Sequence, residues 1–396
     1  MKNYRLLTEY TGPADYVTKA IEFIRKYTEN KKVFCALSGG IDSSTTYLLL
    51  QESDAHVLPV FIDHGLMRKI EGVEEKEHIK KRFPEIKIVD VQDKFLPKIY
   101  GVSDAEEKRK MFKKLYSETF NKIIKEENCD LLADGTILPD LEESFGVKKD
   151  KLKEVMNFEE EQKLREENLE KGFVKSQHNV EITYDVEGTI QPVASLTKDQ
   201  VRDILEYFEM SDDLVYRKAF PGPALAARIV GEITEENLAF EKNVHDIVET
   251  AIDSYYENEY GRSMIINDEN QQEPFQAFAA TAINISEQKV TGLMDGKRVY
   301  LQPKISSRNW NFEKLQKEAS KLKDYSRLLF PLITRTSGLY DVLIRSVNSI
   351  DARTASVTDL PYTLLEEIAE NIIKIPDAKN IYFDITPKPP GTIEYV

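Results

Sequence analysis

The residues with the clearest chemical potential lie in a short polar turn near the start of the chain. Residues 33–37 are apolar and contain no breaker, as expected of a buried parallel strand. The turn that follows and the start of the next predicted helix contain Ser38, Gly39, Gly40, Asp42, Ser43 and Ser44. Free backbone N–H groups at such a helix start attract anions, and glycines let the main chain approach them closely. The serine hydroxyls add donors, and Asp42 could hold a metal ion that neutralises phosphate charge. The pattern predicts a phosphate-binding loop.

Two common glycine-rich signatures do not describe this loop. The GxxxxGKS/T loop requires a lysine that is absent here, and the GxGxxG spacing is absent too. The sequence of residues 38–43 instead resembles the pyrophosphate loop of the N-type ATP pyrophosphatases, which cleave ATP between its α and β phosphates. The simpler alternative is an ordinary Ser/Gly turn that caps a helix.

The segments around the loop alternate between strand and helix patterns. Strands are expected at residues 33–37, 57–62, 86–91 and 131–133, and helices at 15–30, 42–51, 71–83, 104–127 and 197–209. This alternation predicts an α/β fold with a doubly wound parallel sheet. Ligands bind beyond the carboxyl ends of the strands in such sheets. Residues 38–44 and 63–68 should therefore share one edge.

A Phe-Pro-Gly-Pro sequence at residues 220–223 interrupts the alternation and predicts a domain boundary. We expect a first domain at residues 1–218 and a smaller α+β domain at 219–396. The second domain should contain helices at 233–257 and 312–325 and strands near 279–285, 342–347 and 380–385. Residues 147–172 are mostly charged, which favours an exposed helical insertion, a lid or a solvated linker.

Composition limits the partners of the chain. Its 396 residues carry a formal net charge of −15, which disfavours tight binding to a nucleic-acid backbone. Its two cysteines, Cys35 and Cys129, exclude a disulfide scaffold and fit a reducing compartment. No run reaches the roughly 18 apolar residues of a membrane-spanning helix. We therefore expect a cytoplasmic protein with no membrane partner.

The motifs occur in the order of one family. The matching segments are residues 38–44, 61–68, 101–109, 135–144, 174–180, 198–202, 220–223 and 384–394. Together they resemble the ATP pyrophosphatase and dimerisation portion of the GMP synthetase family, over nearly the whole chain. The last segment, Asp-Ile-Thr-Pro-Lys-Pro-Pro-Gly-Thr-Ile-Glu, is long and rarely seen elsewhere.

The resemblance implies a role for each candidate residue. ATP and its pyrophosphate would be bound by Ser38, Gly39, Gly40, Asp42, Ser43, Ser44, Asp63, Arg68 and Gly135. Lys175 and His178 would act from a catalytic lid, together with Asp42, which would also be the metal ligand. The acceptor nucleotide would contact Pro221, Gly222, Pro223, Lys388, Thr392, Ile393 and Glu394, with its phosphate at Lys388. Asp104, Lys108 and Arg109 we interpret more simply, as an exposed helix N-terminus with intrahelical charge pairs.

The resemblance also implies a reaction that uses ATP and Mg²⁺. The O2 oxygen of xanthine in XMP would attack the α-phosphate, pyrophosphate would leave, and ammonia would then displace AMP to give GMP. The family's glutaminase domain is missing from this sequence. The nitrogen would therefore come from a separate glutamine amidotransferase subunit or from free ammonia. A homodimer is expected, since the family pairs through its second domain.

Several departures from the family pattern lie on the acceptor side. Gln177 replaces the first of two lid histidines, Asp134 replaces a glutamine, Lys218-Ala219 replaces His-Pro, and Ala224 replaces a glycine. Two alternatives therefore stay open. A paralogue could adenylate another nucleotide or small-molecule carbonyl, for example for sulfur insertion, with Cys129 as the plausible thiol. A non-catalytic regulatory or partner-binding relative is the third hypothesis, which the complete phosphate loop does not favour.

Overall fold

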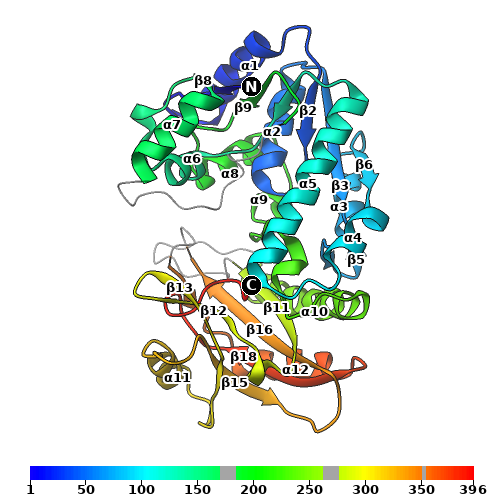
Figure 1. Cartoon of the computed structure of the whole chain (residues 1–396), viewed down its shortest axis with the longest axis vertical. Coiled ribbons are helices and arrows are strands. Elements are labelled where there is room, and N and C mark those ends of the chain that lie inside the picture. Colours follow the sequence, from blue (N-terminus) through cyan, green and yellow to red (C-terminus); the bar gives the residue numbers. More distant parts are fainter. Residues whose placement is uncertain (170–183, 262–275, 350–353) are drawn as a thin grey trace. The chain divides into compact units, whose positions relative to one another are not determined.

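The computed structural model describes residues 1–169, 184–261, 276–349 and 354–396 (Figure 1). Two compact units can be distinguished in it. The first unit comprises Met1–Asp63, Ile79–Asp90 and Lys114–Arg217, and the second comprises His64–His78, Val91–Lys113 and Lys218–Val396. The second unit thus draws on two segments that precede the expected boundary at residue 219.

The first unit is built on a largely parallel sheet. In spatial order its strands are β6 (Lys87–Asp90), β3 (Val57–Asp63), β2 (Val33–Ala36), β7 (Leu131–Ala133), β9 (Gly188–Gln191), β1 (Lys2–Arg5) and β8 (Val155–Asn157). Neighbours pair in parallel except for β1 and β8, which are antiparallel. This sheet confirms the α/β class.

Helices cover both faces of this sheet. The helices wholly or partly in the first unit are α1 (Pro13–Thr28), α2 (Ile41–Glu52), α3 (Glu75–Arg82), α5 (Ala105–Glu127), α6 (Leu138–Phe145), α7 (Phe158–Leu169), α8 (Lys198–Tyr207) and α9 (Asp212–Val215). Phe34 of β2 packs on Phe120 of α5, with ring centroids 5.1 Å apart. Its neighbours Val33 and Cys35 point to the opposite face and are also fully buried. The expected doubly wound arrangement is therefore present.

The charged segment at residues 147–172 is not simply exposed. Its strand β8 pairs with β1, and its helix α7 packs against α6. Glu161 of α7 is buried, accepts a 2.7 Å hydrogen bond from Asn3 and forms an ion pair with Arg5. The described part of this insertion is therefore partly helical and largely exposed, but Leu152, Met156 and Glu161 are buried, and Glu161 neutralises the buried Arg5. Residues 170–172 lie outside the described residues.

The second unit contains a mixed sheet. Its strands, in spatial order, are β10 (Ile229–Val230), β11 (Gln276–Ile283), β16 (Tyr340–Asn348), β18 (Ala378–Asp384), β15 (Leu328–Ile333) and β14 (Lys304–Ile305), with β17 (Ser356–Val357) beside β16. Strands β12 (Val290–Met294) and β13 (Lys297–Leu301) form a separate antiparallel pair, as do β4 (Lys69–Ile70) and β5 (Val73–Glu74). The helices that lie wholly in this unit are α4 (Gln92–Ile99), α10 (Glu235–Tyr260), α11 (Phe312–Ala319) and α12 (Tyr362–Ile372).

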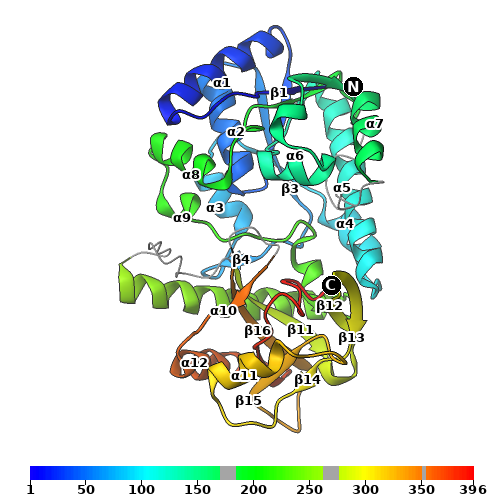
Figure 2. The same ribbon diagram turned by 90° about the vertical axis from the view of Figure 1, so that its left-hand side faces the viewer.

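Alternation along the strands gives this mixed sheet two different faces. Leu328, Ile344 and Phe383 belong to the core formed with α10 and α12, which Figure 2 shows beside the strands. The intervening residues point the other way, where Leu343 and Tyr382 pack with Ile393 and Tyr395 of the C-terminal segment. This second face therefore carries the segment that the sequence assigns to the acceptor.

Two predicted helices are shorter than expected. The predicted helix at 71–83 begins only at Glu75, because residues 69–74 form the β4–β5 pair. The predicted helix at 312–325 ends at Ala319. Among the described residues, no helix combines the length and the apolar character needed to cross a membrane.

Candidate functional site

The predicted phosphate loop connects β2 to α2 in the first unit. Gly39 has φ of +81°, a left-handed conformation that favours glycine. The Ser38 and Ser43 hydroxyl oxygens are 3.1 Å apart, and Ser43 donates to the Gly40 carbonyl at 3.1 Å. The Gly40 N–H donates to the Ser38 hydroxyl at 3.3 Å. Small hydroxyl groups and backbone N–H groups therefore lie close together at the start of a helix. Such an arrangement is suited to binding an anion.

Asp42 at the start of α2 is held by a lysine that the sequence analysis did not assign to the site. Nζ of Lys198, the first residue of α8, lies 2.6 Å from Oδ2 of Asp42. Oδ1 of Asp42 is buried and has no hydrogen-bond partner among the described residues. The carboxylate therefore has one oxygen engaged and one oxygen with unused acceptor capacity.

Gly135 and Asp134 follow β7 and border this loop. A Cβ atom at Gly135 would lie 2.9 Å from the backbone of both Asp42 and Ser43, so only glycine allows β7 to approach α2 this closely. Asp134 accepts hydrogen bonds from the Thr136 backbone N–H at 2.6 Å and from the Gln191 side chain at 3.1 Å. The structure therefore brings Gly135 against Asp42 and Ser43, two of the predicted loop residues.

Other predicted ATP-binding residues lie in α2, at the end of β3 beside β2, and in the second unit. Ser44 is fully buried within α2, and its hydroxyl has no partner among the described residues. Asp63 is the last residue of β3 and is buried. Arg68 belongs to the second unit, where its guanidinium pairs with Glu249 and lies 3.5 Å from Glu75. Lys175 and His178 lie outside the described residues, so their lid role stays a prediction.

The residues around Asp42 could bind a metal ion only if phosphate oxygens supplied the remaining ligands of that ion. Among the described residues, no group of three or more His, Cys, Asp or Glu side chains could hold a metal ion. Mg²⁺ typically binds one or two carboxylates together with substrate phosphates, and the unused Oδ1 of Asp42 suits that arrangement.

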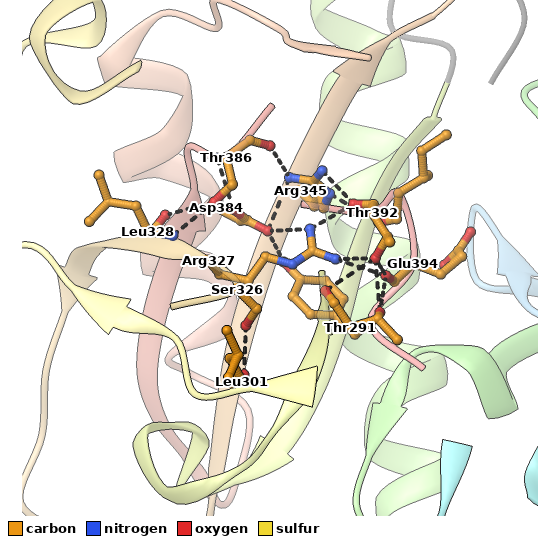
Figure 3. A network of polar contacts seen from close by, with 12 residues as sticks. Thr291, Leu301, Ser326, Arg327, Leu328, Arg345, Asp384, Thr386, Thr392 and Glu394 are labelled. Carbon is orange, nitrogen blue, oxygen red and sulfur yellow. Dashed lines mark hydrogen bonds and ion pairs between the residues drawn. The ribbon is translucent and has the colours of Figure 1, made fainter. Parts of the chain in front are cut away.

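The C-terminal segment of the second unit is held by two buried arginines, shown in Figure 3. Arg327 donates to the carbonyl oxygens of Thr392 at 2.7 Å and Glu394 at 2.8 Å. Arg345 donates to the carbonyl oxygens of Thr386 at 3.0 Å, Ile393 at 3.0 Å and Thr392 at 2.7 Å. Buried carbonyls need such donors, and the bonds fix the backbone of the predicted acceptor segment.

Asp384 neutralises both arginines. Its Oδ2 lies 3.1 Å from Arg327 and 3.0 Å from Arg345, and it accepts a 2.7 Å hydrogen bond from the Tyr395 hydroxyl. Burial alone raises the pKa of Asp384, but the two guanidinium groups outweigh it and hold this pKa below its ordinary value. Lys388 is fixed through its backbone, which pairs with Ala355 at 2.8 and 3.0 Å.

The predicted Pro221-Gly222-Pro223 turn leads into a short 3-10 helix at Ala224–Ala227. Ala224 donates its N–H to the Pro221 carbonyl at 2.9 Å and has φ of +52°. An alanine in this left-handed region is strained by its Cβ. The glycine that the family pattern has at this position would adopt this left-handed conformation without strain.

We expect Ala224→Gly to stabilise the second unit. Glycine removes the Cβ strain, for which roughly 1 kcal/mol is typical. Urea denaturation followed by tryptophan fluorescence checks this, because Trp310 packs in the core of this unit. Ala226→Gly is the control and should destabilise, because that residue is fully buried and has no positive φ. A loss of stability in Ala224→Gly would contradict the strain argument.

The start of α5 differs from its expected exposure. Arg109 pairs with Glu106 at 2.9 Å, and Asp104 accepts from the Glu107 N–H at 2.9 Å, as expected of a charged helix start. Lys108, however, is fully buried and donates to the Ile229 carbonyl at 2.6 Å. The exposed interpretation is therefore wrong for Lys108. Burial lowers its pKa to about 7, and Asp104 only partly opposes this.

This lysine predicts a pH dependence of stability. The unfolded side chain has a pKa near 10.4, so the folded chain binds fewer protons between about pH 7 and 10. Stability should therefore rise with pH across that window and level off below it, where both states are charged. We expect the melting temperature of Lys108→Met to lack this rise between about pH 7 and 9.5. Lys110→Met, on an exposed position of the same helix, should keep it.

The residues that sequence reasoning missed are polar groups at element ends and in strands. Lys198 lies in a segment that resembled the family but received no role. Arg327, Arg345 and Asp384 flank or occupy apolar strands, where alternation with buried residues suggests the solvent side of a sheet. The sequence carries no local signal for their burial, because the C-terminal segment that covers this face of the sheet comes from a distant part of the chain.

Comparison with known proteins places the chain among a group of synthetase subunits. Residues 334–395 match the family model described as GMP synthase C terminal domain. The B subunit of GMP synthase (glutamine-hydrolyzing) from Saccharolobus solfataricus is 32% identical, covering 97% of this chain and 99% of that protein. The protein of the same name from Methanococcus maripaludis is 32% identical, covering 96% and 98%.

Similarity to solved structures is weaker. The NMN synthetase of Francisella tularensis aligns with a TM-score of 0.37 and 14% identity, covering 54% of this chain and 78% of that protein. Nothing about function follows from a similarity of this degree.

Proposed function

The chain belongs to the family of GMP synthase B subunits, and on that premise we propose that it is a ligase that converts XMP to GMP with ATP and ammonia. The similarity over nearly the full length of both chains is the observation that carries this proposal. AMP and pyrophosphate would be the other products. The two units supply, respectively, a phosphate loop and a rigid C-terminal segment, which suit the two substrates.

The first unit would bind the phosphates of ATP. The backbone N–H groups at the start of α2 and the hydroxyls of Ser38 and Ser43 point to an anion-binding role, and Gly135 keeps β7 close to them. Lys198 holds Asp42 in one orientation at 2.6 Å. Such fixed donors lower the barrier for nucleotidyl transfer mainly by positioning and charge neutralisation. Asp63 and Arg68 remain proposed ATP contacts.

Mg²⁺ would bind at Asp42, through the oxygen that has no hydrogen-bond partner among the described residues. When bound, the ion would neutralise phosphate charge as pyrophosphate departs. The chain supplies the Asp42 carboxylate for this purpose, and Lys198 holds that carboxylate in place.

The second unit would bind XMP through its C-terminal segment. Lys388 would meet the phosphate of the nucleotide, while Thr392, Ile393, Glu394 and the 221–223 turn would contact the rest. Arg327 and Arg345 keep the backbone of this segment fixed before the nucleotide arrives. Preorganisation of this kind reduces the ordering cost of binding.

The nitrogen donor and the assembly are proposed by analogy with the family. The relatives are named as the B subunit of a glutamine-hydrolysing enzyme, so a separate glutaminase subunit would supply ammonia. We also propose a homodimer and a cytoplasmic location. Mass measurement by light scattering, with and without the glutaminase partner, tests both assemblies.

The decisive experiment measures pyrophosphate release from Mg-ATP with ammonium and one acceptor at a time: XMP, IMP, GMP, UTP or none. We expect release only with XMP, with GMP as a stoichiometric product. Release with another acceptor, or none with XMP, would overturn the proposal. That result would favour the paralogue with an altered acceptor.

We expect Cys129→Ala to leave the reaction unchanged. Cys129 is buried and burial raises the pKa of its thiol, so little reactive thiolate is present at neutral pH. Steady-state pyrophosphate release should stay within about twofold of the unmodified chain. Cys35→Ala is the control for losing a buried thiol, since Cys35 packs in β2. Collapse of activity in Cys129→Ala alone would support thiol-dependent chemistry.

A further inference from the structure

The second unit carries an open pocket with a strongly positive lining. Its volume is about 580 Å³, and its residues come from β14, from α11, from the loop between them and from the turn after α11. The basic residues in the lining are Lys304, Arg308, Lys314, Lys317, Lys321 and Lys323, and the acidic ones are Glu318 and Asp324. The whole chain has a formal net charge of −15, so this local excess of four positive charges opposes the overall composition.

One carboxylate joins the walls of this pocket. Glu318 on α11 accepts a hydrogen bond from Nζ of Lys304 on β14 at 2.9 Å and another from Nε of Arg308 at 2.5 Å. The Arg308 backbone N–H also donates to the Ser306 hydroxyl at 3.2 Å, which holds the loop. The chain therefore forms the pocket by itself, and both oxygens of Glu318 are engaged in doing so.

The other lysines of the lining are not neutralised in this way. Lys314, Lys317, Lys321 and Lys323 are exposed, and their ammonium groups form no ion pair with any carboxylate in the part of the chain that the structure describes. Lys314 and Lys317 lie three positions apart on α11, where like charges repel each other. The cluster therefore costs stability in the free chain, and a bound polyanion would relieve the repulsion.

The dimensions and charge of the pocket favour a small, multiply charged anion. Small-molecule sites typically have volumes of about 300–1,000 Å³, and this pocket lies within that range. Lysine ammonium groups bind phosphate oxygens as point charges. A triphosphate group carries about four negative charges at neutral pH, because the second pKa of its terminal phosphate is near 6. That charge equals the positive excess of the lining.

Two less polar residues complete the pocket. Leu322 packs against the core that α10 and α12 form with the sheet, and Tyr325 is 39% exposed. An exposed aromatic ring beside a cluster of cations offers a surface on which a nucleobase can stack. The lining therefore suits phosphates with or without an attached base.

We propose that this pocket is a second anion-binding site, which takes a triphosphate group carried by a nucleotide or by inorganic polyphosphate. Its residues differ from those of the phosphate loop at residues 38–44, which belongs to the first unit. Binding here does not require XMP or the reaction proposed above.

Isothermal titration calorimetry on the full chain tests this site, with sodium tripolyphosphate and GTP as probes. The unmodified chain is compared with a triple variant that combines Lys314→Gln, Lys317→Gln and Lys321→Gln. One equivalent of a probe should bind to the pocket, and the triple variant should bind that equivalent about tenfold more weakly, since each lost charge pair typically changes binding severalfold. Affinity should also fall as the salt concentration rises from about 50 to about 200 mM.

Matched variants identify the source of the effect. Lys289→Gln, Lys297→Gln and Lys374→Gln together remove three exposed lysines of the same unit outside the pocket, and binding should not change. Asp324→Asn removes an exposed carboxylate from the lining and should tighten binding about twofold. Tyr325→Ala should weaken the binding of GTP alone if the site takes nucleotides, and neither probe if it takes inorganic polyphosphate.

The melting temperature separates binding from folding. The triple variant should melt no lower than the unmodified chain, because it removes repulsion between like charges. If it does not fold, the charge reversal Lys317→Glu replaces it and should weaken the binding of both probes by about tenfold. Unchanged binding in the variant that is used, or an equal loss in the control with the lysines outside the pocket, would overturn the proposal.

Discussion

Asp42→Asn should reduce kcat/KM for ATP by about 100-fold or more, as is usual when a group that stabilises phosphate or oxyanion charge is removed. The substitution keeps the shape of the side chain but removes the negative charge that Lys198 holds at 2.6 Å and that would bind Mg²⁺. Pyrophosphate release measured over a range of Mg-ATP concentrations checks this. Folding should be little affected, since this ion pair is partly exposed and such pairs contribute at most about 1 kcal/mol.

Two further variants distinguish the effect of the Asp42 carboxylate from a general effect of charge and from the effect of Lys198. Asp15→Asn removes a largely exposed charge that pairs with Lys19 on α1, and it should leave the kinetics unchanged. Lys198→Met removes only the partner of Asp42. If it alone caused the whole loss while Asp42→Asn stayed near normal activity, the lysine and not the carboxylate would be the important group.

Asp384→Asn should destabilise the second unit by about 3–5 kcal/mol, the usual cost of breaking a buried ion pair. The substitution leaves Arg327 and Arg345, both fully buried, without a counter-charge. Urea denaturation monitored by Trp310 fluorescence should show a lower midpoint, and XMP binding should weaken with it. Because the pKa of Asp384 is held below its ordinary value, the stabilisation is present above about pH 4 and is lost on acidification.

Asp341→Asn is the matched control for this prediction. Asp341 is also a buried carboxylate on the same sheet, but it accepts hydrogen bonds from the Ile285 N–H at 2.8 Å and from Asn380 at 2.7 Å. Hydrogen bonds to a charged group typically contribute about 1.5–3 kcal/mol each, and asparagine keeps one acceptor oxygen, so this variant should lose less. Equal losses in the two variants would contradict the central role of the ion pairs.

The sequence was sufficient to predict the strands whose own residues form a recognisable apolar pattern. Strands β2, β3, β6 and β7 are bounded by turns and rich in apolar residues, which made them visible. Strands β1 and β9, with the sequences KNYR and GTIQ, were missed because they contain few apolar residues. Their partners on either side, and not their own side chains, make them strands.

The candidate site was predictable to a similar extent. The loop at residues 38–44 and the segment at 384–394 carry local signatures, so both could be found in the sequence. The pairing of Asp42 with Lys198 and of Glu394 with Arg228 joins residues 156 and 166 positions apart. No local pattern encodes such pairs, because they depend on which elements pack together.

The strand that the charged insertion contributes also affects how copies of the chain meet one another. Strand β8 adds three residues beyond β1, so that β1 is paired on both sides. Without β8, β1 would offer a free row of N–H and C=O groups to any other extended chain. A strand of only three residues, flanked by Lys153, Glu154 and Glu159, is a poor template for such growth. The insertion thereby contributes to colloidal stability, independently of any part it has in catalysis.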